Sequence, residues 1–218
     1  MTLAIFDLDE TLIANDSGSA WIEYLVENGH VEQAFIERDA EYMTRYNAGK
    51  LAMDEYMEFS LQPVVGKTRA ELDLLTPDFV EQKIAPTIYP QAAPLIQELR
   101  EAGHRVLIIS ATVEFVVRPI ARYLGVDDVL AINIEYDAEG RATGCTEGVL
   151  SFREGKVTRL QQWLEETGES LADAQFYSDS INDLPLLEYV DYPFATNPHA
   201  RLAPIAAERG WPVIDWRG

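Results

Sequence analysis

The sequence predicts an α/β fold: a doubly wound parallel sheet with a helical cap inserted after its first strand. From residue 86 onward, short apolar runs alternate with helical patterns, and such alternation with short connections is typical of a parallel sheet. Residues 17–82, by contrast, show helical patterns and no convincing strand. We therefore expect a core domain of residues 1–14 and 86–218 and a cap domain of residues 15–85.

Within the cap, the elements follow from apolar periodicity and from the residues that stop it. Trp21, Tyr24 and Leu25 recur at helical spacing, and Asn28 with Gly29 closes that first helix. The remaining cap helices are expected over residues 31–47, 52–61 and 70–75. An insertion at this point of the chain would lie over the ligand crevice, where a lid belongs.

Within the core, strands and helices are separated by glycines and prolines. The strand that begins at residue 105 should end at Ser110, and Pro119 is tolerable only near the first turn of its helix. The expected strands cover residues 2–7, 105–109, 129–136, 142–150, 174–177, 192–195 and 211–214. The expected helices cover residues 92–102, 115–124, 157–166 and 184–189.

Composition and charge narrow the class of protein. Of the 218 residues, 47% are apolar and 25% are charged, which is ordinary for a globular chain. The net charge is −20 and no two basic residues are adjacent. This argues against a nucleic-acid partner, since neutralising phosphates requires clustered Lys and Arg. The same charge suits cationic substrates or simple solubility.

Cysteine content and hydropathy bear on location. Cys145 is the only cysteine, so an internal disulfide is impossible and the chain fits a reducing compartment. No apolar run approaches the length of a membrane span, and Asp7 interrupts the first apolar run too early for a signal peptide. We expect a cytoplasmic protein without a membrane partner, as a monomer or homodimer.

Two carboxylates stand at the end of the first predicted strand. Asp7 and Asp9 are two residues apart, so both point the same way at the edge where open α/β sheets place their ligand crevice. Because close like charges resist simultaneous ionisation, the pair suits a divalent cation, nucleophilic and acid/base work, or both. The alternative is a pair of solvated turn formers, since Asp is common at strand ends.

Polar residues at or beside other strand ends should converge on the same crevice. They are Ser110, Lys156, Asp179 and Asp183. Clustered carboxylates suit Mg²⁺, and a lysine with a hydroxyl suits a phosphoryl group. Histidine is absent from these positions, which disfavours zinc or a His-based triad. Surface or capping roles are expected for the three histidines, His30, His104 and His199.

In order and approximate spacing, these segments resemble the four motifs of the haloacid dehalogenase-like hydrolases. The matching positions are Asp7 to Thr11, Ser110, Lys156 and Asp179 to Asp183. The resemblance covers nearly the whole chain and implies a Rossmann-like core. The helical insertion resembles the cap of the phosphoserine-phosphatase-like subgroup, class IB.

The resemblance implies a Mg²⁺-dependent phosphatase that acts on a small phosphorylated metabolite. Asp7 would attack phosphorus and form an aspartyl-phosphate. Asp9 would protonate the leaving alcohol and then activate the water that hydrolyses the intermediate. Lys156 would offset the charge on Asp7. A phosphotransferase and a non-catalytic phosphate-sensing module remain as alternatives.

The resemblance also implies which residues hold the metal and the phosphoryl group. The metal would be held by Asp7, the backbone carbonyl of Asp9 and Asp179, with Asp183 and Thr11 supporting these ligands from behind. The residues expected to contact the phosphoryl group are Ser110, Ala111, Lys156 and Asn182.

The cap departs from phosphoserine phosphatases at one of their two substrate-binding positions. Asp16 stands where their acid binds the substrate's ammonium, whereas Ser60 stands where their arginine binds the carboxylate. Acids and aromatic residues in the cap suit a cationic or flat group. The expected specificity residues are Asp16, Trp21, Glu55 and Glu58. Histidinol phosphate, an intermediate of amino-acid biosynthesis with an ammonium and no carboxylate, ranks ahead of phosphoserine and other small phosphomonoesters.

Overall fold

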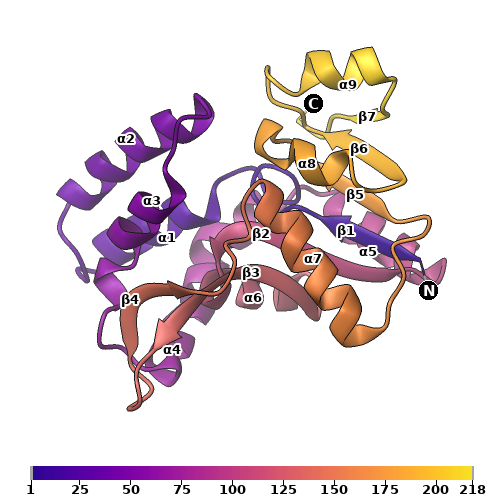
Figure 1. Cartoon of the computed structure of the whole chain (residues 1–218). Helices are drawn as coiled ribbons and strands as arrows, with labels where there is room; N and C mark the ends of the chain where they lie inside the picture. The colour runs from indigo at the N-terminus through magenta and orange to yellow at the C-terminus, as the bar shows by residue number, and fades with distance from the viewer. Residues whose placement is uncertain (1, 218) are drawn as a thin grey trace.

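The computed structural model describes residues 2–217 and confirms the α/β fold (Figure 1). Its seven-stranded sheet has the order β4-β3-β2-β1-β5-β6-β7. Neighbouring strands are parallel except β3 and β4, which form an antiparallel pair at one edge. The strands are β1 Leu3–Phe6, β2 Arg105–Val113, β3 Asp128–Tyr136, β4 Ala142–Glu147, β5 Gln175–Ser178, β6 Tyr192–Thr196 and β7 Val213–Ile214.

Helices cover both faces of this sheet and form the cap between β1 and β2. The cap helices are α1 Ser17–Glu27, α2 Ala34–Asn47, α3 Met53–Ser60 and α4 Arg69–Phe79, followed by a π-helical turn, Val80–Ile84. The core helices are α5 Ala92–Glu101, α6 Glu114–Tyr123, α7 Glu154–Thr167, α8 Leu184–Leu187 and α9 Ala203–Arg209. No helix within residues 2–217 has both the length and the apolar character that crossing a membrane requires.

Successive side chains of β1 point to opposite faces of the sheet, and each face has its own hydrophobic core. Phe6 packs on the side of α5, α6 and the cap, whereas Ile5 packs on the side of α7, α8 and α9. On the first side, Phe6 stacks on Tyr177 and Tyr177 stacks on Phe194, with ring centroids 4.5 Å apart in each pair. This aromatic ladder joins β1, β5 and β6, so it fixes the strands that carry Asp7 and Asp179 relative to each other.

The cap is attached to the core at the sheet edge as well as through the chain. The amide of Gly66 donates to the carbonyl of Ala142 at 2.8 Å, and the amide of Ala142 donates to the carbonyl of Lys67 at 2.9 Å. Residues 66–68 therefore extend the pairing beyond β4, and in Figure 1 β4 lies beside the cap helices. The domain boundaries proposed from sequence, 1–14, 15–85 and 86–218, stay a prediction.

Several expected boundaries differ from the structure: α4 runs to Phe79 where its end was expected at residue 75, and β4 ends at Glu147 where its end was expected at residue 150. β2 runs on through Ser110 to Val113, because its register against β3 shifts between Ile109 and Val113 and the strand continues past the irregularity. α7 begins at Glu154, so Lys156 lies in its first turn. Pro119 lies beyond the first turn of α6, where its missing N–H leaves one helical hydrogen bond unmade.

Candidate active site

The predicted site residues meet at the carboxyl edge of the sheet because β2, β1, β5 and β6 are neighbours in that order. There a cleft with about 630 Å³ of empty space, open solvent at its mouth included, lies between this edge and the cap. Its lining residues are Asp7, Asp9, Glu10, Asp16, Met43, Tyr46, Met53, Tyr56, Ala111, Thr112, Asp179, Ser180 and His199. The core supplies acids and the cap supplies mainly aromatic and methionine side chains.

Lys156 lies between two buried acids beneath the cleft. Its Nζ donates to Asp7 Oδ1 at 2.8 Å and to the Asp183 carboxylate at 2.7 Å, and Ser178 Oγ also donates to Asp183 at 2.7 Å. Burial alone would lower the pKa of Lys156, but Asp183 and Asp7 raise it, so the ammonium stays charged. Burial raises the pKa of Asp7 to about 7 against the opposing effect of Lys156.

The position of Lys156 depends on the glycine before it. A Cβ on Gly155 would lie 1.9 Å from the carbonyl oxygen of Leu150, so no side chain fits there without moving the backbone. This close approach brings the first turn of α7 against the loop that precedes it. The lysine is thereby directed into the core toward Asp7.

Asp9 is held by donors from two elements. Its Oδ1 accepts the backbone N–H of Ser17 at 2.6 Å, and its Oδ2 accepts Thr112 Oγ1 at 3.0 Å and Ser110 Oγ at 3.2 Å. The irregularity in β2 lets two hydroxyls of that strand reach the same carboxylate, as bulges beside active sites commonly do. Burial raises the pKa of Asp9, although these hydrogen bonds oppose the shift.

Asp179 follows β5 and is 2% exposed. Thr11 Oγ1 donates to Asp179 Oδ1 at 2.9 Å and accepts the backbone N–H of Asp179 at 3.1 Å. Burial, followed by the charge of Asp7, raises the pKa of Asp179 well above its usual value. Thr11 therefore joins the first predicted motif to the last.

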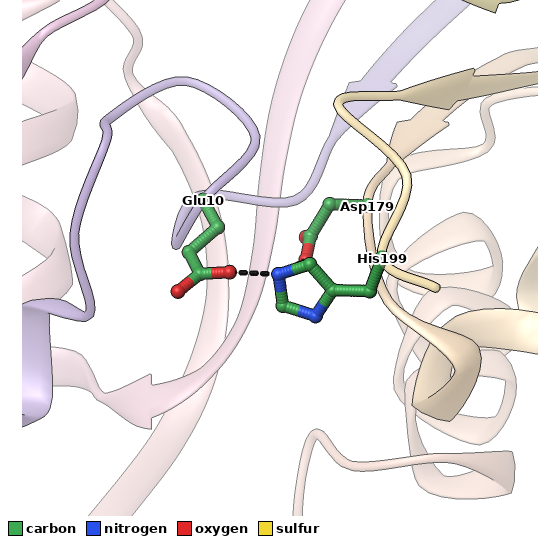
Figure 2. Close-up of side chains that lie close together, drawn as sticks. All are labelled: Glu10, Asp179 and His199. Atoms are coloured by element: carbon green, nitrogen blue, oxygen red, sulfur yellow. Dashed lines mark ion pairs between the residues drawn. The ribbon is translucent and has the colours of Figure 1, made fainter. Parts of the chain in front are cut away.

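His199 lies at the cleft and not in the surface or capping role expected from sequence. Its Nε2 contacts Glu10 Oε2 and lies 3.4 Å from Asp179 Oδ2 (Figure 2). One ligand atom from each of these three residues lies within 4.8 Å of the others, so the group could hold a metal ion. The contact with His199 lowers the pKa of Glu10. Only its place in the sequence indicated that His199 could lie at the site, because it closely follows β6 and therefore lies at the same edge of the sheet.

The cap wall of the cleft contains a second acidic group. Asp16 caps α1 by accepting the backbone N–H of Ser19 at 2.7 Å, and Asp39 of α2 accepts Ser19 Oγ at 2.6 Å and the Tyr56 hydroxyl at 3.0 Å. Burial, with the charges of Asp9 and Asp39, raises the pKa of Asp16 to about 8. Asp16 thus lines the cleft, as predicted, while Asp39 lies behind Tyr56.

Other cleft residues were missed by sequence reasoning. Met43 and Tyr46 lie three residues apart on α2, and Met53 and Tyr56 lie three apart on α3. This spacing places each pair on one helix face, but the same spacing also describes ordinary core packing. Only the arrangement of α2 and α3 over the sheet edge distinguishes the two interpretations.

Several predicted residues lie apart from the cleft. Trp21 packs against Phe79 and Phe115 and lines a smaller neighbouring hollow. Glu55 pairs with Arg45 at the exposed surface, and Glu58 is exposed. Arg45 and Arg69 are the arginines nearest in sequence to Ser60, which stands where phosphoserine phosphatases have the arginine that binds the substrate's carboxylate. Arg45 is engaged with Glu55. The other, Arg69, is engaged with Glu114 and Asp73.

The predicted phosphoryl ligands are only partly at the cleft surface. Ala111 lines it, whereas Ser110 and Lys156 lie directly behind Asp9 and Asp7. Asn182 is buried and accepts Arg153 Nε at 3.3 Å, and Arg153 Nη2 donates to the carbonyl of Gly49 in the cap at 2.9 Å. Arg153 has a positive φ of 51°, a strained conformation that is often found beside functional sites.

Comparisons with known proteins agree with this site. Residues 4–188 match the family model of the haloacid dehalogenase-like hydrolases. A protein of Neisseria meningitidis serogroup C named histidinol-phosphatase is 42% identical over 219 residues, covering 99% of both chains. A protein of Mycobacterium tuberculosis named phosphoserine phosphatase is 30% identical over 220 residues, covering 98% of this chain and 70% of its own.

Solved structures share the fold. A protein of unknown function from Bordetella pertussis Tohama I has a TM-score of 0.91 at 41% identity, over 99% of this chain and 100% of its own. A phosphoserine phosphatase solved with an analogue of its phospho-aspartyl intermediate has a TM-score of 0.70 at 21% identity, over 98% and 92%. Family match, relatives and acidic sheet edge together show that this chain belongs to the haloacid dehalogenase-like hydrolases and is a phosphatase, a phosphoric monoester hydrolase.

Proposed function

We propose that the protein hydrolyses a small amine-bearing phosphomonoester through an aspartyl-phosphate on Asp7, with Mg²⁺ as its cofactor. Lys156, whose ammonium lies 2.8 Å from the carboxylate, favours the ionised form of the Asp7 oxygen that would attack phosphorus and opposes the rise in pKa caused by burial. Asp9 would give a proton to the leaving alcohol and later accept one from the attacking water. The raised pKa of Asp9 supports this role, because a carboxyl that exchanges protons near neutral pH is required.

The chemistry of the acids fits Mg²⁺. Asp7, Asp9 and Asp179 all line one cleft, offer oxygen ligands, and have pKa values that burial raises. Lys156 is already shared between Asp7 and Asp183, so further positive charge would stabilise the remaining acids. The ion would be held by Asp7, the backbone carbonyl of Asp9 and Asp179. When bound it would supply positive charge beside the phosphoryl oxygens.

The cap wall supports an amine-bearing substrate. Asp16 is buried in the cleft, and the described residues that line the cleft include acids and His199 but neither Lys nor Arg. A substrate carboxylate would therefore meet carboxylates in place of the bidentate partner that it needs. The acidic lining of the cleft, with neither Lys nor Arg among its described residues, favours histidinol phosphate over phosphoserine. The name of the relative from Neisseria meningitidis agrees with this preference.

The test is phosphate release with Mg²⁺ from histidinol phosphate, phosphoserine and a generic aryl phosphate, with Asp7→Asn as the blank. We expect kcat/KM to be about a hundredfold higher for histidinol phosphate than for phosphoserine, or ~2.7 kcal/mol of transition-state binding. A preference for phosphoserine would contradict the amine-bearing substrate. Turnover of the aryl ester alone would be compatible with the proposed chemistry but would contradict the proposed substrate.

A further inference from the structure

Asp39 is a buried acid that the proposed chemistry does not use. It lies on α2 with 5% of its surface exposed, and both carboxylate oxygens are occupied. Oδ2 accepts Ser19 Oγ at 2.6 Å and Oδ1 accepts the Tyr56 hydroxyl at 3.0 Å. Ser19 also donates its backbone N–H to Asp16. One hydrogen-bonded group therefore joins Asp16, Asp39 and Tyr56 across α1, α2 and α3.

The hydrogen bonds determine what Tyr56 can offer to a ligand. A phenol has a single O–H proton, and Tyr56 gives it to Asp39. The oxygen of Tyr56, which lines the cleft, can then only accept. Thr112 is in the same situation, because its hydroxyl proton is given to Asp9 at 3.0 Å. Asp16 already accepts the backbone N–H of Ser19, and a cation bound beside it would favour its ionised, acceptor-only form.

These acceptors are close together, as the surroundings of Gly18 show. A Cβ on Gly18 would lie 3.2 Å from Asp16 Oδ1, 3.3 Å from the Tyr56 hydroxyl oxygen and 3.8 Å from Thr112 Oγ1. Two hydroxyl oxygens whose protons are given to other residues thus lie close to the Asp16 carboxylate, and all three residues line the cleft. A ligand group with several N–H donors matches this arrangement, whereas a hydroxyl brings a single donor. The raised pKa of Asp16 is consistent with this, because a bound cation would compensate the nearby acids.

We propose that Tyr56 and Thr112 add two acceptors for the substrate's N–H group beside the expected ammonium position at Asp16, and that Asp39 is the positioning residue that keeps Tyr56 an acceptor. This inference rests on the proposed hydrolysis of an amine-bearing phosphomonoester. Asp39 acts without touching the substrate: removing its carboxylate takes away the acceptor of the Tyr56 hydroxyl, which can then turn its proton toward the cleft. The substrate class that follows is a phosphomonoester with an ammonium or a protonated ring nitrogen.

The experiment compares two esters that differ only in this group, 2-aminoethyl phosphate and 2-hydroxyethyl phosphate. The readout is the ratio of their kcat/KM values in the wild type, Tyr56→Phe, Asp39→Ala and the double variant. Each single change should lower the preference for the amine about tenfold, mainly through KM. The double variant should lower it no further than the larger single change, because Asp39 acts through the Tyr56 hydroxyl.

Gly18→Ala is a second, independent variant. Its added Cβ would lie 3.2 Å from Asp16 Oδ1 and 3.3 Å from the Tyr56 hydroxyl oxygen and so narrows the space beside them, while Ala favours the helix more than Gly. Asp54→Ala, the same substitution at an exposed position of α3, is the matched control and should leave the ratio unchanged.

The outcomes separate this inference from the proposed function. Equal losses for both esters, additive effects in the double variant, or an unchanged ratio in Gly18→Ala would overturn the acceptor site. Turnover of a generic aryl phosphate with no preference between the two small esters would also overturn it while leaving the aspartyl-phosphate chemistry intact. Absence of turnover for all the esters would contradict the proposed function itself.

Discussion

Asp7 and Asp183 share the ammonium of Lys156, and this contact separates the clustered acids into two groups. Asp7 and Asp183 have a buried cation within 2.8 Å. Asp179 instead has the hydroxyl of Thr11 and the nearby ring of His199. Lys156 therefore favours the ionised form of Asp7, whereas Asp179 has no such cation among its hydrogen-bond partners within residues 2–217 and would gain from the proposed metal.

Replacing the proposed nucleophile tests this division. Asp7→Asn keeps the shape of the side chain and leaves Lys156 paired with Asp183, so the fold should persist. We expect kcat to fall by a factor on the order of 10⁴ or more, because the amide cannot attack phosphorus. Phosphate release measures the loss, and circular dichroism confirms the fold. Activity close to wild type would exclude Asp7 as the nucleophile.

Asp16 belongs to the cap wall of the cleft and has no part in the proposed chemistry at phosphorus. Asp16→Asn should raise KM about tenfold for an amine-bearing ester and little for a generic aryl phosphate, since it removes charge from the cap wall. The amide oxygen can still accept the Ser19 N–H, which limits the cost to α1. Steady-state kinetics on both esters provide the comparison, and equal changes in KM would place Asp16 outside the substrate's amine site.

At the scale of single residues, the sequence predicts the position of some site residues but not of others. Asp7, Asp9 and Asp179 follow apolar strands, so topology alone predicts that they meet. Tyr56 and Asp39 have no such signal, because an aromatic residue and an acid on amphipathic helices are ordinary features of a solvated domain. Their contact depends on how α2 packs against α3, a long-range arrangement that the local pattern does not contain.

At the scale of elements, β2 and α6 connect the core with the cap. β2 supplies Ser110 and Thr112 to Asp9, and the next residues begin α6 with Glu114. Glu114 contacts Arg118 within α6 and accepts Arg69 Nη1 of α4 at 2.7 Å. One acid therefore links the strand beside the site to the last helix of the cap.

This link predicts a pH dependence of stability. Burial alone would raise the pKa of Glu114, but hydrogen bonds from Arg118 and Arg69 lower it overall. Because the folded pKa is lower than the unfolded value, the stabilisation is present at neutral pH and is lost as pH falls through the folded pKa. Glu114→Gln should cost about 1 kcal/mol at pH 7, a modest figure since Arg69 is 39% exposed.

Urea unfolding across pH 3–7 measures the effect. The difference in unfolding free energy between wild type and Glu114→Gln should shrink toward the acid end of this range, as the pH falls through the lowered pKa of Glu114 and the wild-type acid becomes protonated. Glu58→Gln, at an exposed position of α3, should show no comparable trend. A difference that grows at low pH would be incompatible with this ion pair.

Element types were predictable from the sequence, but some boundaries were not. Periodicity and helix-stopping glycines predict α5 and α6 within a residue or so of their actual ends. The extension of β2 to Val113 depends on pairing with β3 across an irregular register, which is a tertiary effect. The same applies to Pro119, which is tolerated in α6 because the helix is buried against β2 and β3.

At the scale of the whole molecule, the net charge is −20, and several of the acids that contribute to it lie together in the cleft. The cleft is lined by Asp7, Asp9, Glu10, Asp16 and Asp179. Placing these acids together costs folding free energy unless cations compensate them. The folded chain should therefore be stabilised by a divalent cation to a degree that the unfolded chain is not.

Thermal unfolding with and without metal measures this coupling. Mg²⁺ at about 100 times its dissociation constant should stabilise the fold by about 2.7 kcal/mol, which corresponds to a rise in Tm of roughly 5–10 °C. A chelator should reverse the rise, and NaCl at equal ionic strength should not reproduce it. Asp179→Asn should remove most of the effect, and a Tm independent of Mg²⁺ in the wild type would exclude the proposed site.

The pairing of residues 66–68 with the chain beside β4 has a consequence for association between molecules. β4 is the outer strand of the sheet on its side, and an uncovered outer strand offers free N–H and C=O groups to a strand of another molecule. Here the cap occupies part of that edge through Gly66, Lys67 and Ala142. At the opposite edge, β7 is only two residues long, too short to template pairing. The insertion that shapes the substrate cleft thus also protects the core from edge-to-edge aggregation.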